Sequence, residues 1–260
     1  MLDFHNHLMP AVDDGACDID ESRAGLEMLR SQGVREIITT PHLRGSMTVR
    51  ERDLAGFLDV LDEAWESLKS LVAMEFPDMR IERGVELMLD VPKPDLSDAR
   101  LRLAGTSYVL VEFPFMAVPP HSSLAIRNLR DDGWTPVIAH PERYADMADG
   151  YRLVEHWRDA GAFIQVNCGS LLGYYGSTPR RLAWTLLGRG YADYLSSDYH
   201  SRGKCAVAAC AELLKAKGRI AHHGVLTSTN PRRLLANQPP IPVPPFEAAA
   251  TPLWKRILPW

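Results

Sequence analysis

The start of the sequence carries two histidines, His5 and His7, that are two residues apart. On an extended strand such residues point to the same side, so both imidazoles can reach one ion. By itself the pair is a weak signal, because surface or packed histidines explain most such pairs. The signal becomes stronger when it is joined to acidic residues and histidines in later segments, which are Asp13-Asp14-Gly15, Pro41-His42, Gly84-Val85-Glu86, Glu112, His140-Pro141-Glu142-Arg143 and Ser197-Asp198-Tyr199-His200.

Short runs of strand-forming residues precede most of these segments. They predict seven strands, at Leu2 to His5, Val34 to Thr40, Ile81 to Glu86, Ser107 to Glu112, Thr135 to His140, Ala162 to Asn167 and Asp193 to Asp198. Helix patterns lie between them, at about Asp18 to Gln32, Arg50 to Val72, Ser122 to Asp132, Arg152 to Ala160, Pro179 to Arg189 and Lys204 to Lys217. Several helices end at a glycine suited to a C-cap. Strands that alternate with helices indicate a mostly parallel sheet.

The ends of the predicted strands favour a closed barrel over an open sheet. All but one of them end on or beside a residue that commonly binds metals, and the exception is Asn167. A (β/α) barrel gathers its functional groups at the carboxyl ends of its strands, whereas an open sheet would spread them along an edge. We therefore expect an α/β fold, a distorted seven-stranded (β/α) barrel.

Length and composition exclude several classes of protein. The chain has 260 residues and a net charge of -4, with no long Lys/Arg run, so no nucleic-acid partner is expected. The first residues lack the basic segment and apolar run of a signal peptide, and the longest charge-free stretch, 160–179, is too polar and glycine-rich to cross a bilayer as a helix. The 4 cysteines form no Cys-x-x-Cys pair. We expect a soluble, cytoplasmic protein with reduced thiols.

The motifs D-x-H-x-H, DDG, T-P-H, G-x-E, E-F, A-H-P-E-R-Y, N-x-G-S and S-D-x-H follow one another along the chain. In this order they resemble the PHP (polymerase and histidinol phosphatase) superfamily, and within it the bacterial tyrosine-protein phosphatases of capsular and exopolysaccharide biosynthesis. The resemblance runs from about Leu2 to Leu235. It implies a distorted barrel of PHP type that holds three divalent metal ions, usually manganese, with iron or zinc as alternatives.

The resemblance also implies nine metal ligands. The first ion would take His5, His7, Glu86 and Asp198; Glu86 would bridge to a second ion with Glu112 and His140; the third would take Asp14, His42 and His200. Mixed histidine and carboxylate ligands without thiolate suit manganese, iron or zinc in a catalytic site. Ions about 3.5–4 Å apart can hold a hydroxide and clamp phosphoryl oxygens, which is the chemistry of phosphomonoester hydrolysis.

Two arginines are candidates for contact with the phosphoryl group, because a guanidinium offers bidentate geometry for it. Arg143 is the first choice, and the alternative is a structural ion pair with Glu142 or Asp146. Arg44 is the second choice. Arg202 follows the S-D-x-H motif in what looks like a shortened loop. It either replaces an arginine that the family tends to carry beyond that motif, or only caps a helix.

Other residues have a structural alternative beside the functional one. Asn167 is expected to stabilise a turn, and the alternative is that it lines the substrate mouth. Tyr199, Tyr144 or Phe115 could stack against a substrate phenyl ring or simply pack at the rim. Cys17 begins the C-x5-R spacing of cysteine-dependent phosphatases, but the residues that follow are acidic and lack glycine. A phosphate-binding loop is therefore not expected there.

The chain is predicted to be one barrel, residues 1–237, followed by a proline-rich tail, residues 238–260. That composition is typical of a polyproline-like disordered linker. The alternative is a short peptide that docks on a partner or a membrane surface, since basic residues flanked by Trp, Ile and Leu suit either.

The expected function is metal-dependent hydrolysis of phosphotyrosine in a protein. By the resemblance, the substrate is the tyrosine-rich tail of a bacterial tyrosine autokinase that controls polysaccharide export. One alternative is a PHP phosphatase of a small molecule such as histidinol phosphate, although Asp14 and Glu112 stand where such enzymes more often carry histidine. Another is a non-catalytic metal-binding regulator. The sequence leaves open whether the chain forms a homo-oligomer.

Overall fold

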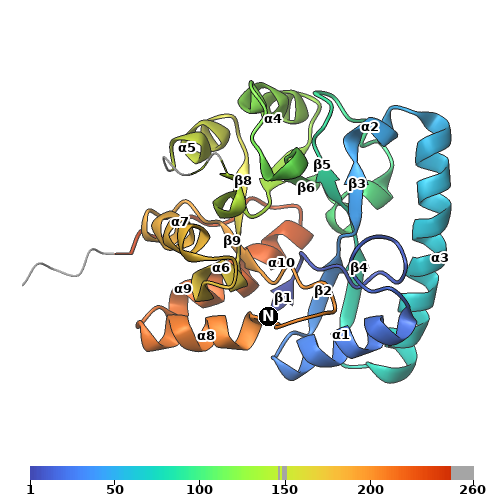
Figure 1. Cartoon of the computed structure of the whole chain (residues 1–260), viewed down its shortest axis with the longest axis horizontal. Coiled ribbons are helices and arrows are strands. Elements are labelled where there is room, and N and C mark those ends of the chain that lie inside the picture. The colour runs from blue at the N-terminus through green and yellow to red at the C-terminus, as the bar shows by residue number, and fades with distance from the viewer. Residues whose placement is uncertain (146, 148–150, 247–260) are drawn as a thin grey trace, which may run out of the picture.

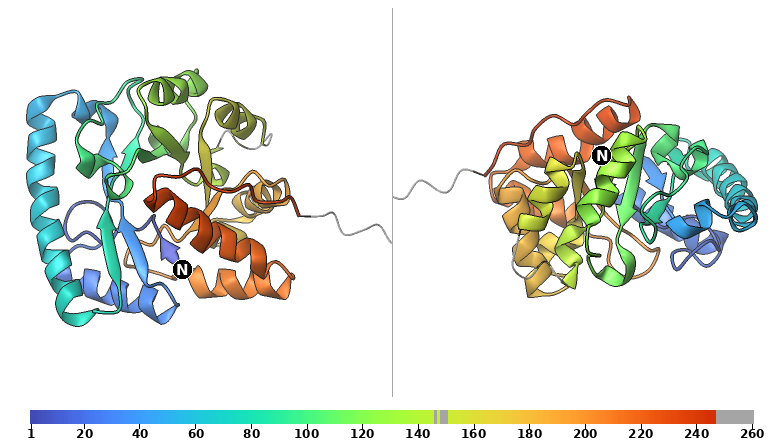
Figure 2. Two further views of the ribbon diagram at one scale, coloured as in Figure 1. Left: turned by 180° about the vertical axis from the view of Figure 1, so that it is seen from behind. Right: turned by 90° about the horizontal axis from the view of Figure 1, so that it is seen from above.

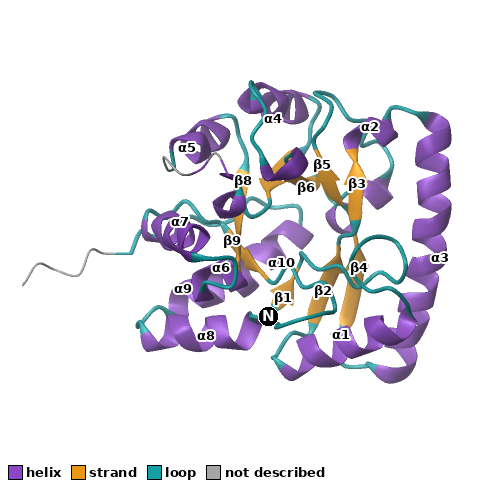
Figure 3. Ribbon diagram, viewed as in Figure 1, coloured by secondary structure: helices purple, strands orange, loops and turns teal. Residues whose placement is uncertain are grey.

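Short parallel strands form the centre of the molecule and helices surround them (Figures 1 and 3). The computed structural model describes residues 1–145, 147 and 151–246. Within these residues, one sheet contains β1 (Leu2–Asp3), β2 (Glu36–Thr39) and β4 (Arg80–Arg83). A second contains β3 (His42–Arg44), β5 (Glu86–Met88), β6 (Tyr108–Glu112), β7 (Thr135–Ile138), β8 (Phe163–Asn167) and β9 (Tyr194–Ser196).

Each of the seven predicted strands is present, and two of them are bent into pairs. β2 continues as β3 beyond Pro41, and β4 continues as β5 beyond Gly84 and Val85. Pro41 has no amide hydrogen to donate to a neighbouring strand, and its carbonyl accepts from the Glu86 amide at 3.0 Å. Beyond the bend His42 is paired with Glu86 in the parallel register. Two predicted ligands therefore lie side by side.

The barrel is closed between β1 and β9. An isolated parallel bridge joins Asn6 to Tyr199, and the Asp198 amide donates to the His5 carbonyl at 2.8 Å. The buried carboxylate of Asp3 accepts hydrogen bonds from both serines at the end of β9. These contacts hold the first residues of the chain against the loop that follows β9.

The longer helices lie where the sequence predicts them. They are α1 (Ile19–Ser31), α3 (Glu51–Glu75), α4 (Ser122–Asp131), α5 (Arg152–Asp159), α7 (Ser177–Gly188) and α8 (Val207–Ala216). α1 begins at Asp18, whose carboxylate accepts from the amides of Asp20 and Glu21 as an N-cap. Shorter helices that the sequence did not predict are α2 (Gly45–Thr48), α6 (Cys168–Leu172), α9 (Ile220–Gly224) and α10 (Asn230–Leu235).

The apolar faces of the helices cover the strands. α3 buries a row of leucines at the predicted helical spacing, which are Leu58, Leu61, Leu68 and Leu71. In the described part of the chain, no helix combines the length and the apolar character that a membrane span requires.

The beginning of the predicted tail lies against the barrel rather than forming a free linker. After α10 the chain crosses the back of the molecule (Figure 2, left). The Ile241 amide donates to Asn230 Oδ1 at 2.9 Å, Val243 is buried, and the Phe246 amide donates to the Gly188 carbonyl at 3.0 Å. Residues 247–260, which carry the predicted docking peptide, lie outside the described residues. The division into barrel and tail therefore stays a prediction.

Candidate metal centre

One end of the barrel gathers all nine predicted ligands into a single cluster. They come from the end of β1 (His5, His7), the loop before α1 (Asp14), the starts of β3 and β5 (His42, Glu86), the end of β6 (Glu112), and the residues after β7 and β9 (His140, Asp198, His200). Each has a ligand atom within 3.5 Å of another member. His42 and Glu86 also lie just beyond the carboxyl ends of β2 and β4. The carboxyl ends of parallel strands meet at one end of a barrel, which is why residues so distant in sequence converge.

Four of the nine form a buried group, His5, His7, Glu86 and Asp198. His5 Nε2 is 3.1 Å from Glu86 Oε2 and 3.3 Å from Asp198 Oδ1. His7 Nε2 is 3.4 Å and 3.5 Å from the same two oxygens. This is the group that the family resemblance implies for a first ion.

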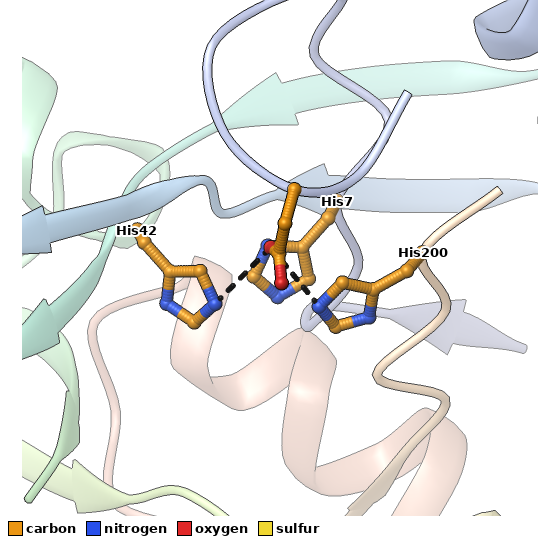
Figure 4. Close-up of side chains that lie close together, drawn as sticks. His7, His42 and His200 are labelled. Atoms are coloured by element: carbon orange, nitrogen blue, oxygen red, sulfur yellow. Dashed lines mark ion pairs between the residues drawn. The ribbon is translucent and has the colours of Figure 1, made fainter. Parts of the chain in front are cut away.

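The remaining ligands lie near His42 and Glu86, and His42 has carboxylates on both sides of its ring. His42 Nδ1 is 3.3 Å from Glu86 Oε2 and 3.2 Å from Glu112 Oε1, while His140 Nε2 is 2.9 Å from the other Glu86 oxygen. His42 Nε2 is 3.5 Å from Asp14 Oδ1 on its other side, and His200 Nε2 lies 3.5 Å from the same oxygen (Figure 4). His42 therefore stands between the predicted second and third sets of ligands.

The histidine rings are oriented so that they can bind cations. Nδ1 of His5 contacts Gln165 Oε1 at 3.0 Å, Nδ1 of His7 contacts Asp13 Oδ2 at 2.6 Å, and Nδ1 of His200 contacts a backbone carbonyl at 3.1 Å. Because these partners are acceptors, Nδ1 carries the proton, and a neutral ring then turns the lone pair of Nε2 toward the carboxylates. Among the described residues, the buried Nε2 atoms of His5 and His7 make no hydrogen bond. This arrangement fits divalent cations between ring nitrogens and carboxylate oxygens.

The pKa values express the same negative field. Burial lowers the pKa of His5, but Glu86 and Asp198 outweigh burial and raise this pKa to about 9. Burial would raise the pKa of Asp198, yet the neighbouring histidines hold it well below its usual range. The Asp198 carboxylate is therefore held in its charged form, which is the form that binds a metal.

The sequence-based analysis did not identify two residues that orient these ligands. Buried Gln165 accepts from His5 Nδ1 and from the His140 amide, and its Nε2 donates to Asn167 Oδ1 at 2.8 Å. Asn167 in turn donates to Asp198 Oδ2 at 2.7 Å. Asn167 thus holds a predicted ligand, which is neither the simple turn nor the substrate contact considered from the sequence. Gln165 lies two residues before Asn167 on β8, so its place on the same face of the strand was the available signal.

Asp13 is the second of these orienting residues. Its Oδ2 atom contacts His7 Nδ1 and accepts from the His42 amide at 3.0 Å, and its Oδ1 atom accepts from the Gly15 amide. Burial would raise the pKa of Asp13, but His7 outweighs burial and lowers it to about 2. The loop leaves no room for a side chain at Gly15, because a Cβ atom there would lie 2.1 Å from the His7 carbonyl oxygen.

Comparison with known proteins identifies the family. A family model described as "Capsular polysaccharide synthesis, CpsB/CapC" matches residues 1–236. The chain belongs to the CpsB/CapC family. It is 33% identical over 206 residues to "Tyrosine-protein phosphatase YwqE" of Bacillus subtilis, covering 77% of this chain and 78% of that protein. It is 32% identical over 183 residues to "Tyrosine-protein phosphatase CpsB" of Streptococcus pneumoniae, covering 69% and 70%.

A solved structure agrees with this membership. This structure comes from "Crystal structures of YwqE from Bacillus subtilis and CpsB from Streptococcus pneumoniae, unique metal-dependent tyrosine phosphatases". It superposes on this chain with a TM-score of 0.76 at 30% sequence identity. The superposition covers 94% of this chain and 100% of the chain in the solved structure. The predicted resemblance and the predicted α/β barrel of PHP type are thereby confirmed.

In this member of the CpsB/CapC family, Arg143 contacts the cluster itself. Its guanidinium pairs with Asp198 Oδ2 at 2.5 Å and stacks 4.4 Å from the ring centroid of Tyr175. The alternative considered from the sequence paired it with Glu142 or Asp146. Glu142 is instead buried, where it accepts from the Asn167 amide and the Ser170 hydroxyl, and Asp146 lies outside the described residues.

The other two predicted arginines have different surroundings. Arg44 is exposed and lines a cavity of about 660 Å³ that also contains His42, Asp14 and Glu112. Arg202 is engaged with the chain, because its Nη2 atom donates to the carbonyls of Asp14 (3.1 Å) and Gly15 (2.6 Å). Arg202 therefore fixes the loop that carries a predicted ligand.

Two of the three aromatic residues suggested by the sequence lie at the cluster but are buried. Tyr144 is buried, and its hydroxyl donates to a backbone carbonyl and accepts from a backbone amide, so it belongs to the core. Tyr199 is also buried, and the side chain of Phe115 lies outside the description. The exposed rings beside the cluster are instead Tyr174 and Tyr175, in the loop between α6 and α7. Two adjacent tyrosines between glycines were the sequence signal for them.

Cys17 is exposed and is not a member of the metal-ligand cluster. Hydrogen bonding to Glu21, with a smaller effect of burial, raises the pKa of the Cys17 thiol. A thiol kept protonated in this way is a poor nucleophile.

Proposed function

We propose that this member of the CpsB/CapC family is a metal-dependent tyrosine-protein phosphatase. The observation that carries the proposal is the cluster of five histidines and four carboxylates at one end of the barrel, in which hydrogen bonds at Nδ1 of His5, His7 and His200 turn their Nε2 atoms toward carboxylates. Family membership and the names of the relatives support the same activity.

Three divalent ions, with manganese as the first candidate and iron or zinc as alternatives, are proposed to occupy the cluster. The first would be held by His5, His7, Glu86 and Asp198, the second by Glu86, Glu112 and His140, and the third by Asp14, His42 and His200. Ions bound there would polarise the phosphoryl group and lower the pKa of a bound water. Glu86 is central to this assignment because its two oxygens face histidines of different groups.

Arg143 and Arg44 are proposed to bind the phosphoryl oxygens. One nitrogen of Arg143 is committed to Asp198, which leaves other N–H groups of the planar guanidinium free to donate. Arg44 lines the cavity of about 660 Å³ that also contains His42, Asp14 and Glu112. The same cavity has apolar walls, formed by Val12, Met47, Phe57 and Met88, which suit a phenyl ring. The cavity therefore supports a phosphotyrosyl substrate.

The physiological substrate is proposed to be a phosphotyrosine-containing protein, namely the tyrosine-rich tail of an autokinase that controls polysaccharide export. The resemblance and the family's role in capsular polysaccharide synthesis support this choice.

The test combines metal analysis of the purified protein with turnover of a phosphotyrosyl peptide. We expect chelation to abolish turnover and His42→Ala to remove most of it, while Arg143→Ala should lose about 100-fold in kcat/KM. His156→Ala, which changes an exposed histidine on α5, is the matched control and should retain activity. Turnover that resists chelators, full activity in His42→Ala, or faster hydrolysis of histidinol phosphate than of the peptide would each contradict the proposal.

A further inference from the structure

A second cavity, of about 250 Å³, opens on the other side of the cluster. It lies between two loops, one joining α6 to α7 and the other joining β9 to α8. Its lining includes Asp198 and His200 of the cluster, Tyr174 and Tyr175 of the first loop, and Lys204 of the second. Figure 4 shows His200 and His42 on opposite sides of His7, so the two cavities approach the cluster from two sides.

The aromatic wall of this cavity is held in a defined position. Both rings lie close to Gly169, where an added Cβ atom would be 3.1 Å from Tyr175 Cε2 and 3.4 Å from Tyr174 Cδ2. Tyr175 is further fixed beneath Arg143. Tyr174 nevertheless leaves 45% of its surface exposed. A fixed and exposed aromatic ring beside a reaction centre is a feature of binding sites rather than of a folded core.

The basic wall of the cavity contains one committed and one available cation. Arg202 is bound to the Asp14–Gly15 loop. Lys204 is exposed, and its Nζ atom lies 6.0 Å from the ring centroid of Tyr174. Within the part of the chain that the structure describes, no carboxylate forms an ion pair with Lys204. Its ammonium group can therefore donate to an incoming anion while the ring keeps it over the cavity.

We propose that Lys204 and Tyr174 form a subsite for an anionic side chain, carboxylate or phosphoryl, that lies next to the scissile phosphotyrosine in the substrate. The inference rests on the proposed function. With the phosphotyrosine ring in the larger cavity and its phosphate at the cluster, a neighbouring residue of an extended chain is about 3.3–3.6 Å further along per position. Both cavities are lined by residues of the cluster, so a flanking residue further along the peptide can occupy the smaller one. Lys204 then acts on substrate selection rather than on the reacting atoms.

The test uses a set of phosphotyrosyl peptides that differ only in the flanking residues. These are serine in the neutral peptide, glutamate in the acidic peptide, a second phosphotyrosine in the doubly phosphorylated peptide, and lysine in the basic peptide. For the wild type, kcat/KM should be higher for the acidic or doubly phosphorylated peptide than for the neutral one. Comparison of those two arms identifies whether carboxylate or phosphoryl is preferred.

Lys204→Met keeps the length of the side chain and removes its charge. It should reduce the ratio of anionic to neutral kcat/KM by about 3- to 10-fold, through KM rather than kcat. Lys204→Glu should reverse the preference toward the basic peptide. Lys215→Met, which removes an exposed lysine of α8 paired with Glu212, should keep the wild-type ratio. Metal content and Tm of each variant report whether the fold is intact.

An unchanged ratio in Lys204→Met, or the same fall in Lys215→Met, would overturn the subsite. A wild type that hydrolyses the neutral peptide without preferring any flank would overturn the subsite alone. A wild type that hydrolyses none of the peptides would overturn the proposed function and the subsite with it.

Discussion

Replacement of Gln165 by leucine tests whether hydrogen bonds outside the ligand set orient the metal centre. Gln165 is fully buried and joins His5 Nδ1 (3.0 Å), the His140 amide (3.3 Å) and Asn167 Oδ1 (2.8 Å). Leucine has a similar volume and no polar atom. In Gln165→Leu the ring of His5 can rotate or change tautomer, so its Nε2 lone pair is no longer held toward the carboxylates.

The expected effect has two parts. Loss of a residue that orients a metal-binding histidine typically weakens metal affinity 10–100-fold, which corresponds to about 1.4–2.7 kcal/mol of binding free energy. Three buried polar groups also lose a partner, at roughly 1 kcal/mol or more each, so the free energy of unfolding of the chelated protein should fall by about 3 kcal/mol. A domain of ordinary stability survives such a loss.

Calorimetric titration with Mn²⁺ measures the first effect, and urea unfolding of the chelated protein measures the second. Asn230→Leu is the matched control, because Asn230 is also fully buried and makes three hydrogen bonds, two with Ile241 and one with the Asp193 carbonyl. It should lose similar stability and keep the wild-type affinity for Mn²⁺. If Gln165→Leu binds Mn²⁺ as tightly as the wild type, or if Asn230→Leu weakens binding equally, the reasoning about ligand orientation is wrong.

Three further predictions follow from the same structure. Burial, only partly offset by Arg158, raises the pKa of Asp193 from 3.8 to about 6. The contribution of Asp193 to stability is therefore present below pH 4 and is lost as the pH rises to 6. Relative to Asp193→Asn, the wild type should lose about 3 kcal/mol of unfolding free energy over that range, and a pH-independent difference between the two proteins would contradict this. Gly15→Ala should weaken Mn²⁺ binding and lower Tm, because the added Cβ atom would collide with the His7 backbone. The control Gly56→Ala, which has open space around it in α3, should raise Tm slightly. Equal Tm values for the two variants would exclude the collision. Addition of Mn²⁺ at about 100 times Kd to the metal-free protein should add about 2.7 kcal/mol to the free energy of unfolding. A thermal scan detects this as a rise in Tm, and an unchanged Tm would argue against a cation site in the folded barrel.

The clustering of the proposed ligands was predictable because a barrel places the ends of its strands together. Residues that follow strands at the two edges, such as His5 after β1 and Asp198 after β9, can reach one another only if the sheet closes. The bends at Pro41 and Gly84 were less evident, since each lies within or beside a run that reads as one strand. The parallel register between the two chain segments is the same before and after the bends, and it sets His42 beside Glu86.

The residues that orient the ligands were harder to predict, because their partners lie on other elements. Arg143 follows β7 by sequence, but its partner Asp198 follows β9. The position of Gln165 on β8 indicates the face it occupies, yet not that His5, 160 residues away in sequence, would be its partner. Side-chain alternation predicts direction, while the pairing across the barrel depends on the tilt and register of all the strands.

The adjacent acids Asp13 and Asp14 show where sequence reasoning ends. They are the same residue type at consecutive positions of one motif. The Asp13 side chain is only 5% exposed and contacts His7, whereas that of Asp14 is 72% exposed and faces His42 and His200. The difference arises from the backbone, because the Gly15 amide caps Asp13 and the chain passes directly against the His7 carbonyl. Only one of two consecutive side chains can then turn into the barrel. The turn that buries Asp13 beside His7 therefore leaves Asp14 at the open end of the barrel. There Asp14 can bind a cation that Asp13 cannot reach.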